Sequence, residues 1–333
     1  MRFDAKIDQK NQRPMLPIVI IGGPTASGKS RLALDIALKM QGALINADSQ
    51  QIYGQLPILT AAPTEEEKRQ TPHFLYGNWD DFTQICSASL WREKAVKAIH
   101  HCHQEGLLPC VVGGTGFYLQ ALTEGLSPIP NIPSHVRKEV KRYHQEWGAE
   151  KFHARLCELD PEIGNRLHIE DTQRLIRAFE VVTYTHIPLS QWQKKLKIMS
   201  EKDVWEFYTI ILKPDRKNLH QRADKRLKWM FDNGAIEEVR NFFKKDLPAN
   251  HPLLKAVGVR EISSYLSGES LEEAFEKTKI HTHQYIKRQM TWFNHHLKGS
   301  YIVEDLYPGP NSCDTLKAIF KGLHQRGLKV TNK

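Results

Sequence analysis

A phosphate-binding loop is the part of this sequence whose residue types and spacing point to the most definite chemistry. Residues 23–30 read Gly-Pro-Thr-Ala-Ser-Gly-Lys-Ser, which matches the pattern G-x-x-x-x-G-K-[ST]. The glycines let the backbone curl, so that successive N–H groups and the N-terminus of the next helix converge on anionic oxygens. Lys29 adds a mobile positive charge, and Ser30 adds a hydroxyl group suited to Mg²⁺.

The ligand expected for this loop is a chain of phosphates. A glycine-rich turn without a ligand is the alternative, and the Lys-Ser ending argues against it. The motif itself does not reveal whether the phosphates belong to a nucleotide. The residues expected to bind them are Gly23, Pro24, Thr25, Ala26, Ser27, Gly28, Lys29 and Ser30.

A carboxylate after a second apolar run is the next candidate for chemistry. Residues 43–47 are Ala-Leu-Ile-Asn-Ala, and Asp48 follows them. Asp48 could accept a proton or hydrogen bond from an incoming nucleophile, ligate a metal, or cap a helix, and the residue types leave these roles open. The side chains of Ser49, Gln50 and Gln51 could read the edge of a base.

Two arginines four residues apart form a third candidate. Arg222 and Arg226 lie on one face of a helix expected from Leu219 to Met230 and ended near Asn233-Gly234. One of them could reach departing phosphates, and an ordinary surface ion pair is the alternative.

The elements that must position these residues alternate between β-type runs and helical stretches. Short apolar runs at 18–21, 43–47 and 109–112 each end in a polar or glycine-rich turn, the third being Gly113-Gly114-Thr115-Gly116. This alternation is typical of a parallel sheet wrapped by helices, in which ligands bind outside the carboxyl ends of the strands. We therefore predict an α/β fold, a P-loop parallel sheet flanked by helices, with the three turns meeting at one site.

A change in amino-acid composition divides the chain into segments. A proline-bearing hinge at 127–133 opens a stretch rich in helix formers, bases and aromatic residues, and β character returns at 204–212. A later helix is expected at 271–294, where the aromatic residues are core residues rather than platforms for bases. The expected organisation is a first core part at 14–123, a helical insertion at 124–203, a mostly helical second core part at 204–324, and flexible tails at 1–13 and 325–333.

Net charge and composition indicate which partners and which cellular compartment to expect. The formal net charge is +9, which favours a polyanionic partner through counterion release, although any single basic cluster could be a solvated helix face. The five cysteines include no C-x-x-C pair, so neither a structural zinc site nor a disulfide framework is indicated. No secretory signal and no apolar run of the roughly 20 residues that span a bilayer is present. We therefore expect a cytoplasmic protein that has no contact with membranes.

Three kinds of enzyme use such a phosphate loop: a kinase, an NTP-driven motor or switch, and a transferase whose donor carries a diphosphate leaving group. A motor or switch usually needs an apolar strand that ends in an acidic residue. The run before Gly113 ends without one, which leaves Asp48 as the only such acid. A module that only binds RNA would leave the phosphate loop without a use.

In their order along the chain, these motifs resemble those of the bacterial tRNA dimethylallyltransferases, also called tRNA isopentenyltransferases. The resemblance runs nearly end to end, through residues 23–30, 47–53, 62–64 with 72–73, 111–119, 171–180, 256–261 and 285–293. It implies transfer of a dimethylallyl group from dimethylallyl diphosphate to N6 of adenine 37 in tRNA, with release of diphosphate. It also implies that the target base is extruded into the site and that the helical insertion contacts the anticodon arm.

The resemblance also implies roles for single residues in an enzyme expected to act as a monomer. Lys29 and Ser30 with Mg²⁺ would hold the diphosphate, Arg222 would neutralise its charge, Asp48 would accept the proton, and Thr115 would lie between donor and acceptor. The implied tRNA contacts are Asp48, Ser49, Gln50, Gln51, Thr115, Gln173, Arg174, Leu175, Ile176, Arg177, Lys255, Gly258, Arg260, Lys287, Arg288 and Gln289.

The chain departs from the usual family pattern at a few positions. Residues 59–63 are Leu-Thr-Ala-Ala-Pro where the family usually has Gly-Thr-Ala-Lys-Pro, and His283 and Asn294 replace usual arginines. These changes put individual RNA contacts in doubt. An enzyme that prenylates free AMP is the nearest alternative, and the long basic insertion with the segment 171–180 argues for RNA.

Overall fold

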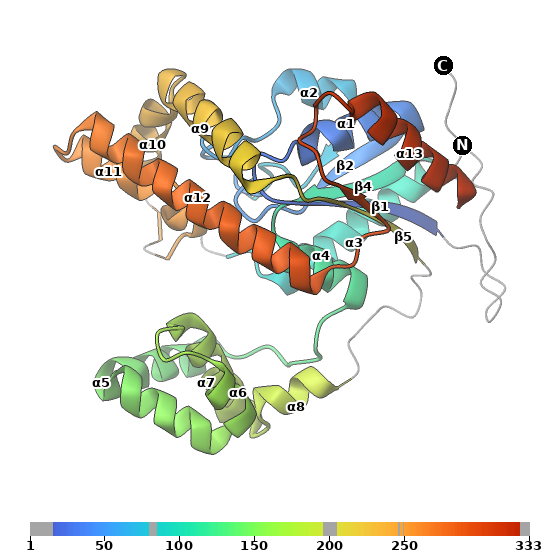
Figure 1. The fold of residues 1–333 in the computed structure, drawn as a ribbon. Helices are drawn as coiled ribbons and strands as arrows, with labels where there is room; N and C mark the ends of the chain where they lie inside the picture. The colour runs from blue at the N-terminus through green and yellow to red at the C-terminus, as the bar shows by residue number, and fades with distance from the viewer. Residues whose placement is uncertain (1–15, 80–84, 196–204, 246, 249, 327–333) are drawn as a thin grey trace, which may run out of the picture. The chain divides into compact units, whose positions relative to one another are not determined.

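Six parallel strands form a single sheet in the order β3-β2-β4-β1-β5-β6 (Figure 1). The computed structural model describes residues 16–79, 85–195, 205–245, 247–248 and 250–326. The prediction of an α/β fold with a parallel sheet is confirmed. The strands are β1 Leu16–Gly22, β2 Gly42–Asn46, β3 His73–Phe74, β4 Leu108–Gly113, β5 Trp205–Leu212 and β6 Tyr301–Val303.

The apolar runs explain the four longer strands. β1, β2 and β4 are buried along almost their whole length, which is typical of parallel strands covered on both faces. Runs predicted at 18–21, 43–47 and 109–112 match them, although Ala47 lies just after β2. The start predicted for β5 at Val204 lies outside the described residues, and the strand is seen from Trp205.

Helices cover both faces of the sheet and give the core unit its three layers (Figure 1). Side chains of α1 and α13 pack on one face, and those of α3 and α4 pack on the other. None of the described helices is both long and apolar enough to span a bilayer. The helices of this unit are α1 Lys29–Met40, α2 Glu65–Gln70, α3 Ala88–Gln104, α4 Gly116–Glu124, α9 Arg216–Asp232, α10 Ala235–Phe243, η1 Pro252–Lys255, α11 Val259–Leu266, α12 Leu271–His296 and α13 Ser312–Gln325.

Residues 124–201 form a second compact unit, separate from the core unit at 1–123 and 202–333. Its core gathers around Phe152 and Phe179, whose ring centroids lie 4.6 Å apart. The carboxylate of Asp160 accepts hydrogen bonds from the backbone N–H groups of Ile163 and Ser190, which ties two helices together. The helices are α5 Ser134–Leu159, α6 Pro161–Arg166, α7 Thr172–Thr185 and α8 Leu189–Lys194.

The C-terminal part of the core unit is mostly helical, as predicted, and its helices are longer than expected. α9 begins at Arg216, three residues before the predicted start, because the Asp215 carboxylate caps its first N–H groups. The tail predicted at 1–13, and residues 327–333 of the tail predicted at 325–333, lie outside the described residues. Gln325 still belongs to α13, and Arg326 donates a hydrogen bond to the carbonyl of Phe207.

Candidate active site

The phosphate loop leads from β1 into α1, and its backbone is held from the C-terminal side of the chain. Gly28 has φ +94°, and a Cβ atom placed on it would lie 1.5 Å from the carbonyl oxygen of Tyr307. The N–H of Tyr307 donates to the carbonyl of Ser27 at 3.0 Å. The Ser27 hydroxyl is buried and has no hydrogen-bond partner among the described residues. The loop is therefore braced from outside and keeps one polar group available to a ligand.

Lys29 carries a positive charge that burial has partly destabilised. Its ammonium group lies 3.3 Å from the carbonyl oxygen of Pro24. Burial lowers the pKa of Lys29 from 10.5 to about 8, and Arg226 adds to this effect while the Asp48 carboxylate opposes it. A buried cation short of partners favours an anionic ligand.

One arginine of α9 contacts the phosphate loop, and another contacts the segment at Tyr307 that braces it. Arg226 Nη2 donates to Thr25 Oγ1 at 2.6 Å, and Arg222 Nη1 donates to the carbonyl of Tyr307 at 2.7 Å. Burial lowers the pKa of Arg226 to about 10, and the neighbouring Arg222 adds to the shift. The sequence prediction that one arginine faces the phosphates chose Arg222, whereas the hydrogen bond to the loop's own side chain comes from Arg226.

Asp48 stands at the carboxyl end of β2, in a turn held by a buried amide. Asn46 Oδ1 accepts from the N–H of Asp48 at 2.8 Å, and Asn46 Nδ2 donates to the carbonyl groups of Asp48 and Leu75. Asp48 Oδ1 accepts from the N–H of Gln50 at 2.9 Å. Residues 49–52 form a turn, so the helix-cap role considered for Asp48 is wrong. Its second carboxylate oxygen is left for chemistry.

The turns after β2 and β4 touch through hydroxyl groups. The N–H of Ser49 donates to Thr115 Oγ1 at 2.9 Å, and Thr115 Oγ1 donates to Ser49 Oγ at 3.2 Å. The N–H of Thr115 donates to the carbonyl of Ala47. Thr115 is therefore beside Asp48 in space, as its expected place between donor and acceptor requires.

Gln289 of α12 joins these turns to the phosphate loop. Its Oε1 accepts from the N–H of Thr25 at 2.8 Å, and its Nε2 donates to the carbonyl of Gly114 at 2.9 Å. The prediction that the three strand-end turns meet at one site is confirmed. Gln289 is 6% exposed and its amide is bonded at both ends, and the tRNA contact expected of it stays a prediction.

The other tRNA-contact residues expected in the core unit fall into two groups. Lys255, Arg260, Lys287 and Arg288 are exposed. Gln51 is engaged internally, since its Nε2 donates to the carbonyl groups of Thr60 and Ala61. Its expected role in reading the edge of a base stays a prediction. Gln50 differs, because its buried Oε1 has no partner among the residues described.

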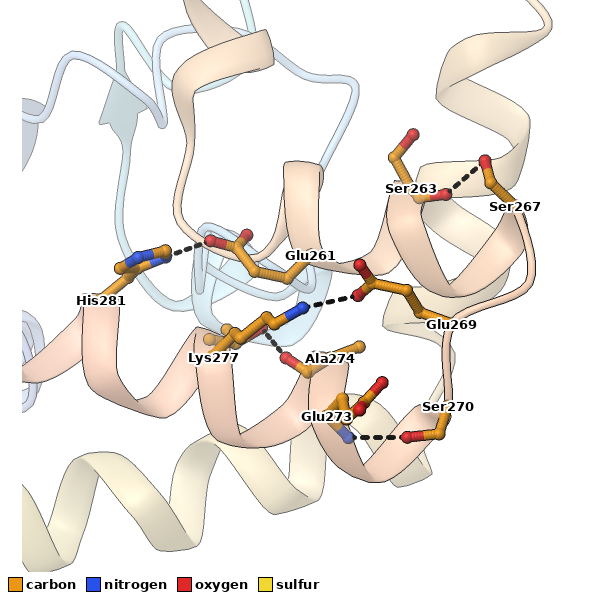
Figure 2. Close-up of polar contacts among 10 residues, drawn as sticks. Glu261, Ser263, Ser267, Glu269, Ser270, Glu273, Ala274, Lys277 and His281 are labelled. Atoms are coloured by element: carbon orange, nitrogen blue, oxygen red, sulfur yellow. Dashed lines mark hydrogen bonds and ion pairs between the residues drawn. The ribbon is translucent and has the colours of Figure 1, made fainter.

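One carboxylate fixes the turn between η1, which ends at Lys255, and α11, which carries Arg260. Glu261 Oε2 accepts from the N–H of Gly258 at 2.9 Å, and Glu261 Oε1 makes a short contact with His281 Nδ1 of α12. Figure 2 shows this contact beside the exposed pair Lys277–Glu269 in the α11–α12 hairpin. Gly258 itself begins α11 and is buried, so any contact it makes with RNA goes through the backbone.

The expected tRNA contacts of the second unit lie at the start of α7. Gln173 and Arg174 are exposed, and Arg177 lies 3.3 Å from the carboxylate of Glu180. Leu175 is 0% exposed and belongs to the unit's core, with Ile176 packed against it. The expectation that Leu175 touches tRNA through its side chain is therefore wrong.

A magnesium ion would find few protein ligands here. No group of three or more His, Cys, Asp or Glu side chains that could hold a metal occurs in the described part of the chain. Mg²⁺ usually keeps several waters and takes one or two protein ligands plus phosphate oxygens. The exposed hydroxyl of Ser30 in the first turn of α1 fits that limited role.

Two residues of the site, Tyr307 and Asn46, are missed by the sequence reasoning. Arg226 belongs to the predicted arginine pair, and no local signal separates it from Arg222. Tyr307 acts through its backbone, which its residue type does not reveal. Asn46 did carry a signal, because an amide inside an otherwise apolar strand needs buried partners.

Comparison with known proteins now decides the family. Residues 51–296 match the family model described as IPP transferase. The chain belongs to the IPP transferase family. A tRNA dimethylallyltransferase from Azorhizobium caulinodans is 44% identical to it over 282 residues, 84% of this chain and 89% of that protein. One from Paramagnetospirillum magneticum is 42% identical over 285 residues, 85% of this chain and 90% of that protein.

Solved structures of this family share the fold. The tRNA delta(2)-isopentenylpyrophosphate transferase of Staphylococcus epidermidis aligns with a TM-score of 0.65 and 29% identity, covering 93% of this chain and 99% of that one. A eukaryotic dimethylallyltransferase acting on tRNA aligns with a TM-score of 0.77 and 25% identity, covering 96% of this chain and 81% of that one. The family resemblance drawn from the motifs is confirmed.

Proposed function

We propose that this IPP transferase moves a dimethylallyl group from dimethylallyl diphosphate to N6 of adenine 37 in tRNA. The observation that carries the proposal is that the Gln289 side chain joins the phosphate loop to the turn after β4 by two hydrogen bonds. The cation-lined loop with Lys29 and Arg226 accounts for a diphosphate, and Asp48 with Thr115 accounts for an acceptor amine. The names of the relatives support the same reaction.

The substrates and the site residues account for every bond and proton in this reaction. The N6 nitrogen forms a bond to C1 of the dimethylallyl group as the C1–O bond breaks, and diphosphate leaves with the electron pair. The carboxylate of Asp48 takes the proton that N6 loses. Because an allylic C–O bond ionises once its leaving group is stabilised, Lys29, Arg222 and Arg226 supply most of the catalysis. The carboxylate is secondary.

The proposal includes Mg²⁺ as a partner of the diphosphate. The hydroxyl of Ser30 would hold the ion together with phosphate oxygens and water. When bound, the ion neutralises negative charge on the leaving group. The ammonium of Lys29 and the N–H groups of residues 23–30 hold the same diphosphate from the protein side.

The acceptor in this proposal is the anticodon arm, with the target base turned out of its stack. The exposed Lys255, Arg260, Lys287 and Arg288 would bind the backbone, and the net charge of +9 supports a polyanionic partner. The helical unit at 124–201 would hold the RNA as well. The proposed enzyme acts as a monomer in the cytoplasm, where its tRNA substrate is found.

A labelling assay with three acceptors tests the proposal. Purified protein with Mg²⁺ and radiolabelled dimethylallyl diphosphate is given tRNA, AMP or buffer, and a tRNA transcript with guanine at position 37 is the matched control. We expect label only in the tRNA that has adenine 37. Label in AMP but not in tRNA would support an AMP prenyltransferase, and transfer of the γ-phosphate of ATP would support a kinase.

A further inference from the structure

The side chain of Gln289 joins the two halves of the site in a single amide group. It is buried on α12 and spans 264 residues of sequence to Thr25 and 175 residues to Gly114. The N–H of Thr25 can only donate and the carbonyl of Gly114 can only accept, so the amide has one satisfactory orientation. Turning it over would place donor against donor and acceptor against acceptor.

The Gly114 end of this connection lies beside the carboxylate of Asp48. A Cβ atom placed on Gly114 would lie 2.4 Å from Gln289 Nε2 and 3.5 Å from Asp48 Oδ2. The peptide that accepts from Gln289 also leads directly into Thr115. A displacement of the amide therefore shifts the carbonyl next to both acceptor-side groups.

The Thr25 end lies in the phosphate loop. A diphosphate bound there competes with Gln289 Oε1 for the N–H of Thr25, because the N–H groups of such a loop converge on anionic oxygens. Losing this bond leaves a buried acceptor unpaired unless the amide shifts. The state of the donor half is therefore transmitted to Gly114 through one side chain.

We propose that Gln289 is a positioning residue that couples the two substrates, so that diphosphate at Thr25 and RNA at the Gly114–Thr115 turn change each other's affinity. The inference rests on the proposed function, since it takes these two ligands as the substrates. Linkage makes the coupling reciprocal: each ligand alters the dissociation constant of the other by the same factor. A purely structural role for Gln289 would leave that factor unchanged.

The test compares Gln289→Met with wild type. Methionine has a similar length and lacks the amide donor and acceptor. Gln284→Met is the matched control, because Gln284 is exposed on the same helix. The dissociation constant of the non-reactive analogue dimethylallyl thiodiphosphate is measured with and without a saturating anticodon stem-loop RNA.

We expect the analogue's dissociation constant in wild type and Gln284→Met to change by about 5-fold or more on adding RNA, within the usual range of coupling. In Gln289→Met this factor should fall to about one, while binding of each ligand alone changes little. An unchanged factor in Gln289→Met, or a factor of one in wild type that binds both ligands, would overturn the inference.

A second measurement needs no variant and covers the case in which Gln289→Met does not fold. In ¹⁵N-labelled wild type, adding the stem-loop RNA alone should move the amide resonance of Thr25, and an unmoved resonance contradicts the coupling. Failure of the proposed function can be told apart from failure of the coupling. If the proposed function is wrong, wild type does not prenylate tRNA; if only the coupling is wrong, wild type still prenylates tRNA.

Discussion

At the scale of residues, the site is an arrangement of partly buried cations near one carboxylate. Residue types and spacing were enough to select the phosphate loop, Asp48 and the arginine pair. They could not decide between Arg222 and Arg226, because both lie on one helix face and only the fold brings Thr25 to one of them. The partner of Arg226 lies 201 residues away in the sequence, and the partner of Arg222 lies 85 residues away.

Removing either arginine should slow the chemical step. We expect Arg226→Ala and Arg222→Ala each to lower kcat by about 10²-fold or more, because each guanidinium stabilises charge that develops on the leaving diphosphate. Single-turnover kinetics measure this, and circular dichroism checks the fold. Lys225→Ala is the matched control on the same helix and should leave kcat nearly unchanged. Normal turnover in Arg226→Ala would remove that residue from the account.

Replacing the carboxylate of Asp48 separates chemistry from structure. Asparagine keeps an oxygen that accepts from the N–H of Gln50 and so keeps the turn, but it cannot take a proton. We expect Asp48→Asn to lower kcat by about 10²-fold and to leave the KM for dimethylallyl diphosphate within a few-fold of wild type. A variant with unchanged kcat would mean that Asp48 is not the proton acceptor.

At the scale of elements, long apolar and amphipathic segments were predictable and short ones were not. The strand β6 was missed because it has three residues, one of them exposed, and pairs only with β5. The sequence predicts a mostly helical second core part and no strand at 301–303. It also predicts the helix at 271–294, which is α12, whereas the contact of Glu261 with His281 is a tertiary contact that no periodicity reveals.

The α11–α12 hairpin gives a prediction about RNA binding. Glu261→Ala leaves the buried N–H of Gly258 without its acceptor, which should cost about 1–3 kcal/mol of unfolding free energy. The turn between Lys255 of η1 and Arg260 of α11 should loosen. The KM for tRNA should then rise, while the KM for dimethylallyl diphosphate stays unchanged. Glu269→Ala is the matched control, since its pair with Lys277 is exposed (Figure 2). Equal effects of the two variants on tRNA would argue against the special role of Glu261.

At the scale of the whole molecule, the sheet and its two covering layers follow from the sequence. Continuous apolar runs ending in glycine-rich turns predict parallel strands, and the turn after each longer strand predicts the site. The change in composition predicts a helical insertion at 124–203, and the second compact unit spans 124–201. The sequence does not reveal hydrogen bonds between distant residues, such as the one from Gln289 to Gly114. These bonds form only when the folded sheet and α12 come together.

The burial of the sheet predicts the reactivity of the thiols. Burial raises the pKa of Cys102 to about 12 and raises that of Cys110 further, whereas Cys313 is exposed. Because the thiolate is the reactive form, a raised pKa leaves almost none of it at pH 8. We expect Ellman's reagent to label Cys313 rapidly in the native protein and to label Cys102 and Cys110 only on unfolding. Peptide mass spectrometry measures the labelling rate of each cysteine. Labelling of Cys110 as fast as that of Cys313 would contradict the burial of Cys110 in the core.

The proposal that the phosphate loop binds a prenyl diphosphate is tested most directly by measuring which polyphosphate binds there. Isothermal titration calorimetry in the presence of Mg²⁺ compares the affinities of dimethylallyl thiodiphosphate and ATP for wild type and for Lys29→Ala. We predict that the prenyl analogue binds wild type and loses about 10²-fold or more in affinity in Lys29→Ala, since that ammonium pairs with its charge. Binding of ATP that depends on Lys29, together with no binding of the prenyl analogue, would contradict the account.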